Sequence, residues 1–246
     1  MSFLILGCGF TGSRVAARLV ARGERVVVAS RDTIERGEII EARGMRVLHS
    51  LPIPYARKIQ GAERLVYFST TGVYGDQPHV NGHSVALGNH PRLDEERGVA
   101  AACANHLILR PAAIYGPGRG VHVSIQQGRH KYWGDGSNYI SRIHVDDLAA
   151  ITAAALVTDL TGAYPVADDE PAQAIDITRF CAELLGVPVP PPEPGMPGAD
   201  TRRANRQVDG RAIRQALGVE LAFPSFRSGI PAAIAASKLM AAPSLK

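Results

Sequence analysis

The chain has 246 residues, a length that fits one large domain or a core domain with a small appendage. Apolar residues make up 46% of it, enough for a sizeable core, and scattered rather than clustered arginines carry its formal net charge of +4. This distribution indicates a solvated surface and excludes the basic patch of a nucleic-acid-binding protein.

The three cysteines, Cys8, Cys103 and Cys181, lie far apart and form no C-x-x-C pair. Their number and spacing predict a reducing compartment, with no disulfide framework and no metal site. The chain enters an apolar run at once, with no basic leader, and its longest apolar run, residues 148–157, is too short to cross a membrane. We therefore expect a cytoplasmic protein with no membrane partner.

The first predicted elements are a short apolar strand at residues 3–6, a glycine turn, a helix at 13–22 and a second strand at 26–29. The turn reads Gly7-Cys8-Gly9-Phe10-Thr11-Gly12. This is the G-x-G-x-x-G pattern of dinucleotide-binding proteins, in the strand–turn–helix context that the pattern requires. An ordinary glycine-rich loop is the alternative interpretation.

Each glycine of the turn has its own role in the predicted dinucleotide site. Gly7 permits the tight turn, Gly9 lets the backbone approach a pyrophosphate, and Gly12 lets the helix pack close to the strand. The helix that follows offers backbone N–H groups and the positive end of its dipole to the phosphates. The predicted cofactor contacts in this turn are Gly7, Cys8, Gly9, Phe10, Thr11 and Gly12.

The second predicted strand ends at Ala29-Ser30-Arg31, where an NAD-selective site usually carries an acidic residue. Arg31 offers a fork of donors to a 2′-phosphate, and Ser30 adds another donor. We therefore predict that Ser30 and Arg31 contact the cofactor and that the cofactor is NADP. Asp32, one residue further on, keeps NAD as the alternative.

The rest of the chain continues the alternation of strands and helices. Further strands are predicted at residues 45–48, 64–69, 107–110, 143–145 and 164–167. Further helices are predicted at residues 33–43, 55–60, 93–105, 146–157, 177–185, 211–217 and 230–239. This alternation predicts an α/β protein with a doubly wound parallel sheet, the Rossmann architecture.

The composition changes after Ala167, and a proline tract follows at residues 188–197. We therefore predict a dinucleotide-binding domain at residues 1–167 and a small, α-rich substrate lobe at residues 168–246, to which residues 118–141 also contribute. A small-molecule substrate is expected in the cleft between the two lobes, and a homodimer is left open.

Three further motifs follow the glycine turn: S-T-T-G-V-Y-G at residues 69–75, R-P-A-A-I-Y-G-P-G at 110–118 and R-I-H-V-D-D at 142–147. Together with the turn they resemble the extended short-chain dehydrogenase/reductase family, the NAD(P)-dependent epimerase/dehydratase group. The resemblance covers nearly the whole chain. It implies a nicotinamide cofactor and oxidoreductase, epimerase or dehydratase chemistry on a substrate held between the lobes.

The resemblance also implies roles for single residues. Family members use a Ser or Thr at the end of a central strand to hydrogen-bond the substrate, and Thr70 matches that position. Tyr74, in the same motif, is the second candidate catalytic residue. The further implied cofactor contacts are Ser69, Pro111, Ala112, Ala113 and Ile114.

The sequence departs from the family pattern at the acid/base pair. Family members carry a Tyr and, four residues later, a Lys that lowers the tyrosine pKa, but the predicted helix at 93–105 contains neither residue type. The G-x-G-x-x-G spacing also departs from the group's usual spacing, and one strand–helix unit before Arg64 is shortened. Two interpretations of this atypical member stay open. One is an enzyme that recruits Tyr74, Tyr115 or His144, and the other is a catalytically degenerate dinucleotide-binding sensor or scaffold.

Overall fold

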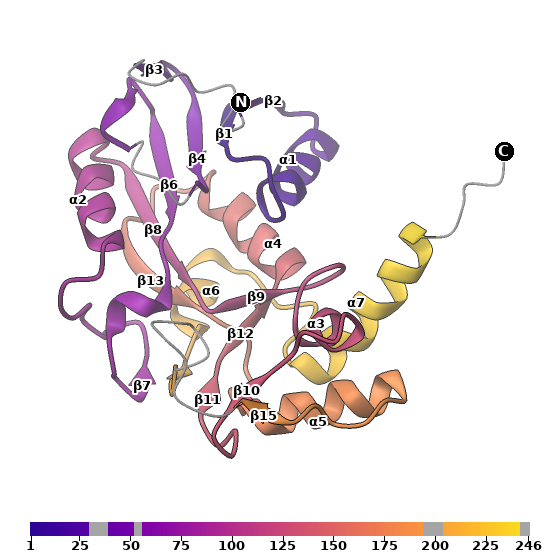
Figure 1. Cartoon of the computed structure of the whole chain (residues 1–246). Coiled ribbons are helices and arrows are strands. Elements are labelled where there is room, and N and C mark those ends of the chain that lie inside the picture. Colours follow the sequence, from indigo (N-terminus) through magenta and orange to yellow (C-terminus); the bar gives the residue numbers. More distant parts are fainter. Residues whose placement is uncertain (30–38, 52–55, 194–203, 242–246) are drawn as a thin grey trace, which may run out of the picture.

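The computed structural model describes residues 1–29, 39–51, 56–193 and 204–241. Its centre is a six-stranded sheet with the strand order β13-β8-β6-β4-β1-β2, in which all neighbours are parallel (Figure 1). Its strands are β1 (Ser2–Leu6), β2 (Arg25–Ala29), β4 (Arg46–His49), β6 (Arg64–Phe68), β8 (His106–Pro111) and β13 (Gly162–Val166). The predicted doubly wound parallel sheet is confirmed.

Seven helices are found among the described residues, and none of them is long and apolar enough to cross a membrane. They are α1 (Gly12–Ala21), α2 (Arg92–Ala102), α3 (Val121–Gln126), α4 (Val145–Ala155), α5 (Ala174–Leu185), α6 (Arg211–Leu217) and α7 (Phe226–Ala241), and two 3-10 turns, η2 (Ala56–Lys58) and η3 (Thr71–Tyr74), accompany them.

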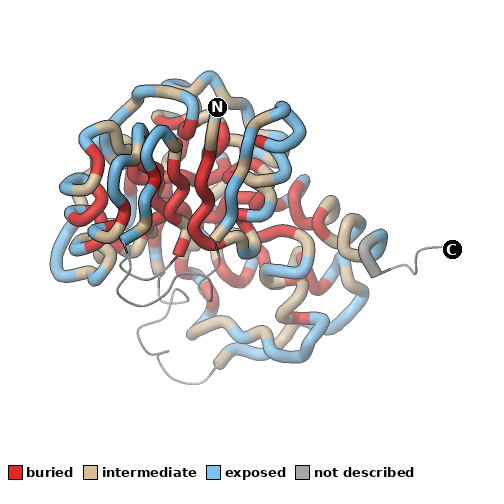
Figure 2. Tube along the Cα trace, turned by 90° about the horizontal axis from the view of Figure 1, so that it is seen from above, coloured by how far each residue is buried: buried red, intermediate tan, exposed pale blue. Residues whose placement is uncertain are grey.

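Helices cover both faces of the sheet because successive side chains of a strand point to opposite faces. Phe3 and Ile5 of β1 belong to an apolar core shared with α1, α4 and α6. Leu4 and Leu6 of the same strand belong to a second core shared with α2 and η2. Figure 2 shows the buried strands enclosed between these layers.

The order of the strands reverses between β1 and β4. β2 and β4 lie on opposite sides of β1, so the chain reverses the direction in which it adds strands after β2. Open α/β sheets bind ligands outside the carboxyl ends of the strands at such a reversal. The glycine turn follows β1 directly and therefore lies at this reversal point.

The helix predicted at residues 33–43 is wrong in its described part, and residues 33–38 lie outside the described residues. Ile40–Glu41 forms strand β3, which pairs in parallel with β5 (Ile59–Gln60). Ile40 lies opposite Ile59 in this pair, and β-branched residues favour such cross-strand contacts over a helix. The helix predicted at residues 55–60 is likewise reduced to η2 and β5.

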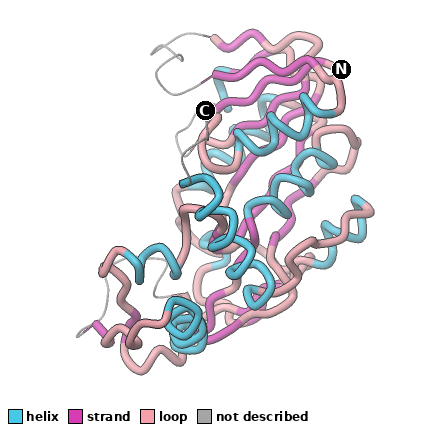
Figure 3. The backbone as a smooth tube through the Cα atoms, turned by 90° about the vertical axis from the view of Figure 1, so that its right-hand side faces the viewer, coloured by secondary structure: helices cyan, strands magenta, loops and turns pink. Residues whose placement is uncertain are grey.

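A second lobe lies beyond the carboxyl ends of the sheet strands (Figure 1 and Figure 3). Its helices α3, α5 and α7 share an apolar core that includes Ile125, Ile177 and Phe226. Short strands accompany them: β7 (His79–Val80), β9 (Ala113–Tyr115), β10 (Tyr132–Trp133), β11 (Tyr139–Ile140), β12 (Arg142–His144), β14 (Ala172–Gln173), β15 (Pro192–Glu193) and β16 (Gln207–Val208). β9 follows β8 and pairs with β12, which leads into α4, so this pair joins the lobe to the sheet.

Arg64, the first residue of the central strand β6, stabilises the amino ends of the sheet strands, opposite the end at which the second lobe lies. Its buried guanidinium donates hydrogen bonds to the carbonyl oxygens of Ala155 and Leu160, each at 2.6 Å, and to the side-chain oxygen of Asn105. These acceptors belong to the end of α4, the loop after it and the residue before β8. One side chain thus joins three segments at the amino end of β6.

Candidate functional site

The glycine turn is held between the ends of three strands. Gly7 has a φ of +94°, which glycine tolerates best, and its N–H donates to the carbonyl oxygen of Ala29 at 2.7 Å. The Ser50 hydroxyl, after β4, lies 3.0 Å from the carbonyl oxygen of Leu6 and 2.6 Å from that of Gly7, and donates to them. The turn is therefore fixed at the carboxyl ends of β1, β2 and β4.

Gly9 and Gly12 lie in opposite surroundings. A β-carbon added at Gly12 would lie 2.1 Å from the carbonyl oxygen of Gly7, whereas one added at Gly9 would meet no described atom within 4 Å. The first turn of α1 carries no acidic side chain. The exposed backbone at Gly9 and the positive end of α1 thus leave room and favourable potential for a diphosphate.

Phe10 links the turn to the second lobe. The Arg14 guanidinium donates to the carbonyl oxygen of Phe10 at 2.6 Å and lies 4.5 Å from the centre of its ring, while that of Arg119 lies 5.3 Å from the ring. Arg14 also donates to Asp146 at 3.1 Å, at the start of α4. Thr11 is buried at the N-cap of α1, and Cys8 is half-buried with a free thiol.

The second group of predicted residues follows β6, two strands from β1 in the sheet. Ser69 is 5% exposed, and its hydroxyl has no hydrogen-bond partner among the described residues. Thr70 is half-buried, and its hydroxyl oxygen accepts a hydrogen bond from the N–H of Gly72 at 3.1 Å. The Thr70 hydroxyl hydrogen is therefore available to another acceptor. A buried unsatisfied hydroxyl such as that of Ser69 is typical of a site that a ligand completes.

Tyr74 lies inside a buried polar cluster and has no exposed surface. Its hydroxyl accepts a hydrogen bond from Arg110 at 3.2 Å, and Arg110 also makes two bonds, of 3.0 and 2.7 Å, to the carboxylate of Glu96. Burial raises the pKa of the Tyr74 hydroxyl, so it is a poor base. This arrangement favours a structural role, and the catalytic role of Tyr74 stays a prediction.

The predicted contacts at residues 111–114 lie at the same edge of the sheet, where β8 ends and β9 begins. Pro111 and Ala112 are buried, and the N–H of Ala112 donates to the carbonyl oxygen of Val166 at 2.9 Å. Ala113 is exposed and Ile114 half-buried. Because all sheet strands are parallel, these residues share one edge with residues 7–12 and 69–70, whereas Ser30 and Arg31 lie outside the described residues.

The other side chains that the sequence suggested for recruitment are also buried. Tyr115 is 3% exposed, its hydroxyl lies 3.5 Å from the carbonyl oxygen of Ser225, and burial raises its pKa. His144 is 1% exposed, and burial lowers its pKa to about 4. Its Nδ1 accepts the N–H of Asp146 at 3.2 Å and caps α4. These contacts favour structural roles for Tyr115 and His144.

Three residues at the site were not predicted from the sequence: Ser50, His90 and Arg92. Arg92, at the start of α2, donates to the Tyr67 hydroxyl at 2.7 Å and to the carbonyl oxygen of Phe68 at 3.3 Å, directly before Ser69. The sequence carried no signal for these residues, because Ser50, His90 and Arg92 belong to none of the recognised motifs.

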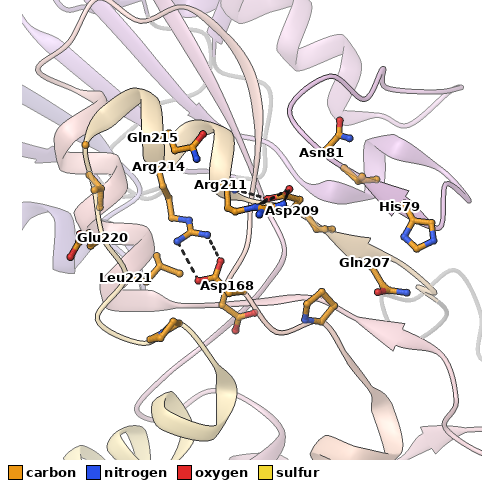
Figure 4. A pocket seen from close by; sticks show the side chains of 17 residues that line it. His79, Asn81, Asp168, Gln207, Asp209, Arg211, Arg214, Gln215, Glu220 and Leu221 are labelled. Atoms are coloured by element: carbon orange, nitrogen blue, oxygen red, sulfur yellow. Dashed lines mark hydrogen bonds and ion pairs between the residues drawn. The ribbon is translucent and has the colours of Figure 1, made fainter.

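A cavity of about 990 Å³ lies beyond the end of β13, between α6 and the strands β7 and β16 (Figure 4). Polar side chains of His79, Asn81, Gln207 and Arg211 line it, together with the buried carboxyl of Asp168. Of the predicted cofactor and catalytic residues that the structure describes, none lines this cavity. Nor do any three His, Cys, Asp or Glu side chains in the described ranges cluster to hold a metal ion.

Known proteins resemble this chain in sequence, although no family model matches it. The chain is 30% identical over 211 residues to a 3-diazoavenalumate denitrifying reductase of a Streptomyces species, covering 78% of this chain and 66% of that protein. It is 32% identical over 120 residues to short-chain dehydrogenase/reductase family 42E member 1 of Danio rerio, covering 43% of this chain and 30% of that protein. The chain thus spans less than two thirds of the length of the curated relatives it matches.

Solved structures share the fold over nearly the whole chain. A functionally unknown conserved protein from Silicibacter pomeroyi is 26% identical, with a TM-score of 0.79 and coverage of 96% of this chain and 99% of that one. MoeE5 in complex with UDP-glucose and NAD is 19% identical, with a TM-score of 0.80 and coverage of 98% and 100%. Human epimerase family protein SDR39U1 with NADPH is 17% identical, with a TM-score of 0.76 and coverage of 95% and 99%.

Proposed function

The chain belongs to the extended short-chain dehydrogenase/reductase family, in its atypical epimerase/dehydratase-like group, and we propose that it is an NADP(H)-dependent reductase of a small electrophilic substrate. The observation that carries this proposal is the glycine turn, with its open backbone at Gly9, on the same sheet edge as the hydroxyls of Ser69 and Thr70. When bound, a reduced nicotinamide supplies a hydride to an electrophile held at that edge.

The cofactor site is proposed to run across the carboxyl ends of β2, β1, β4 and β6. Residues 7–12 would hold the diphosphate, and residues 69 and 111–114 would contact the nicotinamide half. The carbonyl oxygen of Ala29, the residue that precedes Ser30 and Arg31 in the sequence, accepts a hydrogen bond from the N–H of Gly7. NADP is favoured over NAD because Arg31 matches the charge of a 2′-phosphate.

Reduction is favoured over epimerisation by two facts. The relative that matches 78% of this chain is named a reductase. The described part of α2 contains neither Tyr nor Lys, the pair on which the family's acid/base chemistry depends. Hydride transfer to a strong electrophile needs less acid/base assistance than proton abstraction from a sugar, so it tolerates the loss of that pair.

The missing pair also favours a second candidate function, a dinucleotide-binding sensor or scaffold without turnover. One assay separates the two functions. The protein and NADPH are mixed with aldehydes, ketones and an aryl diazo compound, and nicotinamide absorbance is followed. Nucleotide sugars are incubated with the protein and the oxidised cofactor and analysed by chromatography, because their epimerisation leaves nicotinamide absorbance unchanged. We expect oxidation of NADPH by the carbonyl or diazo compounds and no conversion of the nucleotide sugars. Dinucleotide binding without turnover of any compound would favour the sensor, and rapid conversion of nucleotide sugars would contradict both.

The cofactor preference is tested by calorimetric titration of the wild-type protein and of Arg31→Ala with NADPH and NADH. Losing a charge-assisted contact of ~1.5–3 kcal/mol should weaken NADPH binding by roughly 10- to 100-fold and leave NADH binding unchanged. Arg22→Ala, an exposed substitution at the far end of α1, is the matched control. Tighter binding of NADH than NADPH by the wild type, unaffected by Arg31→Ala, would show that the preference is wrong.

A further inference from the structure

His90 and Thr70 flank the same glycine at the end of β6. A β-carbon added at Gly72 would lie 3.0 Å from Nε2 of His90 and 3.4 Å from the methyl carbon of Thr70. Both side chains are half-buried, in contrast to the fully buried Tyr74. A glycine at position 72 is what lets the imidazole approach the strand end so closely.

The hydrogen bond on the other side of the ring fixes where the His90 proton lies. The backbone N–H of Arg92 donates to Nδ1 of His90 at 3.1 Å. A neutral imidazole carries one N–H, and because Nδ1 accepts, the hydrogen lies on Nε2. His90 therefore presents an N–H donor on the side of Gly72 and Thr70.

The charges around His90 keep the ring neutral. Burial and the positive charge of Arg92 lower the pKa of His90 below 6.5, and Arg206 acts in the same direction, while Glu96 opposes them. Protonation at Nδ1 would also bring its new N–H against the N–H of Arg92. At neutral pH the ring is thus a fixed hydrogen-bond donor and not a reservoir of protons.

We propose that His90 and Thr70 together donate hydrogen bonds to the oxygen of a substrate carbonyl, and that His90 thereby takes the place of the missing tyrosine hydroxyl. This role rests on the proposed function. His90 and Thr70 would hold the carbonyl oxygen while a bound reduced nicotinamide, oxidised in the step, would supply a hydride to the carbonyl carbon. The electrons of the C=O π bond would move to oxygen, and a water molecule would then protonate that oxygen. Both donors stabilise the developing negative charge and end the step in the protonation state in which they began it.

The test compares wild type, His90→Ala and His90→Gln with NADPH and the dicarbonyl probe phenanthrenequinone. His90→Ala removes the donor and should lower kcat by about 100-fold, the usual cost of one oxyanion donor, with NADPH affinity unchanged in calorimetry. A glutamine amide can place an N–H near the position of Nε2, so His90→Gln should recover most of the loss. The control is His83→Ala, an exposed histidine of the same loop.

The pH profile separates a neutral donor from a titrating acid. In the wild type, kcat should be level at neutral pH and fall only at pH values below 6.5, because the pKa of His90 is lowered and protonation at Nδ1 sets its new N–H against the N–H of Arg92, which displaces the ring from its donating position. His90→Gln should lack this acid limb. A wild-type rate that rises on acidification, or His90→Ala turnover equal to wild type, would overturn the role of His90 alone. If the wild type binds NADPH but reduces neither the probe nor any carbonyl compound of the panel, both the reductase proposal and the role of His90 are overturned.

Discussion

Gly9 and Gly12 belong to the same sequence motif but are small for different physical reasons. Gly12 has no space for a side chain because the carbonyl oxygen of Gly7 lies 2.1 Å from its missing β-carbon. Gly9 has open space there, so only a ligand requires it to be small. The motif thus combines one requirement of folding with one requirement of binding.

We therefore expect Gly9→Val and Gly12→Ala to fail in different ways. Gly9→Val should unfold within a few degrees of wild type yet bind NADPH at least ~100-fold more weakly, a loss of ~2.8 kcal/mol. Gly12→Ala should unfold at a much lower temperature, because the helix must move away from the strand. Thermal unfolding and calorimetric titration measure the two effects. If Gly9→Val binds NADPH as tightly as the wild type, the turn does not form part of the cofactor site.

The same distinction shows which site residues a sequence can reveal. The glycine turn was predictable because its strand and helix are contiguous with it. His90 was not, because its significance comes from Gly72 and Arg92, which only the folded loop brings against the two sides of its ring. The sequence also could not show that Tyr74 is fully buried and Thr70 only half-buried, because both residues belong to one short motif.

At the scale of elements, α2 is joined to the sheet by acidic side chains. Glu95 accepts hydrogen bonds from Nε2 of His49 and from the N–H of Ala56, both at 2.8 Å. Glu96 forms the two-bond pair with Arg110 of β8. Acids near the N-terminus suit the helix dipole, but the burial of Glu95 and Glu96 and their bonds to His49 and Arg110 show that these two face the sheet.

Glu96→Ala is expected to destabilise the protein severely. It leaves the guanidinium of Arg110 buried without its carboxylate, and removing one member of a buried pair costs about 3–5 kcal/mol. Asp94→Ala is the control, because Asp94 pairs with Arg97 on the exposed side of the same helix and should cost less than about 1 kcal/mol. Denaturant unfolding gives both values. Equal losses in the two variants would contradict the structural role of the buried pair.

The parallel sheet was predictable because its central strands β1, β4, β6 and β8 are largely buried and read as apolar runs, although the edge strand β2 is partly exposed. The short strands were not. Ile40–Glu41 and Ile59–Gln60 pair across a long separation in sequence, and β9 and β12 do the same, so no local period marks them. In its described residues, the crossover between β4 and β6 contains the short turn η2 and strand β5 and no α-helix, which the short spacing between the two strands indicated only in outline.

At the scale of the whole molecule, His144 makes stability depend on pH. It packs at the junction of β12 and α4 against the rings of Tyr115 and Phe223. Its pKa of about 4 in the folded protein lies below the ordinary value of 6.5, since burial outweighs the attraction of Asp146, and Arg14 and His122 lower it further. Between these pH values the unfolded chain binds a proton that the folded protein does not, so stability falls on acidification.

The expected loss between pH 6.5 and pH 4 is at most about 3 kcal/mol, at ~1.4 kcal/mol for each unit of pKa. His144→Asn keeps an acceptor for the N–H of Asp146 but cannot titrate. Denaturant unfolding at pH 7 and pH 5 should therefore show a smaller decrease in the variant than in the wild type, whatever the variant's stability at pH 7. A decrease of the same size in both proteins would assign the acid sensitivity to other groups.

The position of Arg64 has a consequence for how the protein tolerates change. β6 has five residues, with Arg64 at one end and Ser69 and Thr70 just beyond the other. In a library of single substitutions scored once for cellular abundance and once for reduction, changes at Arg64 should lower both scores. Changes at Thr70 should lower the second score alone. The side chains that hold the fold and those expected to contact substrate thus lie at opposite ends of one short strand, so the end at Ser69 and Thr70 can change without loosening the end at Arg64.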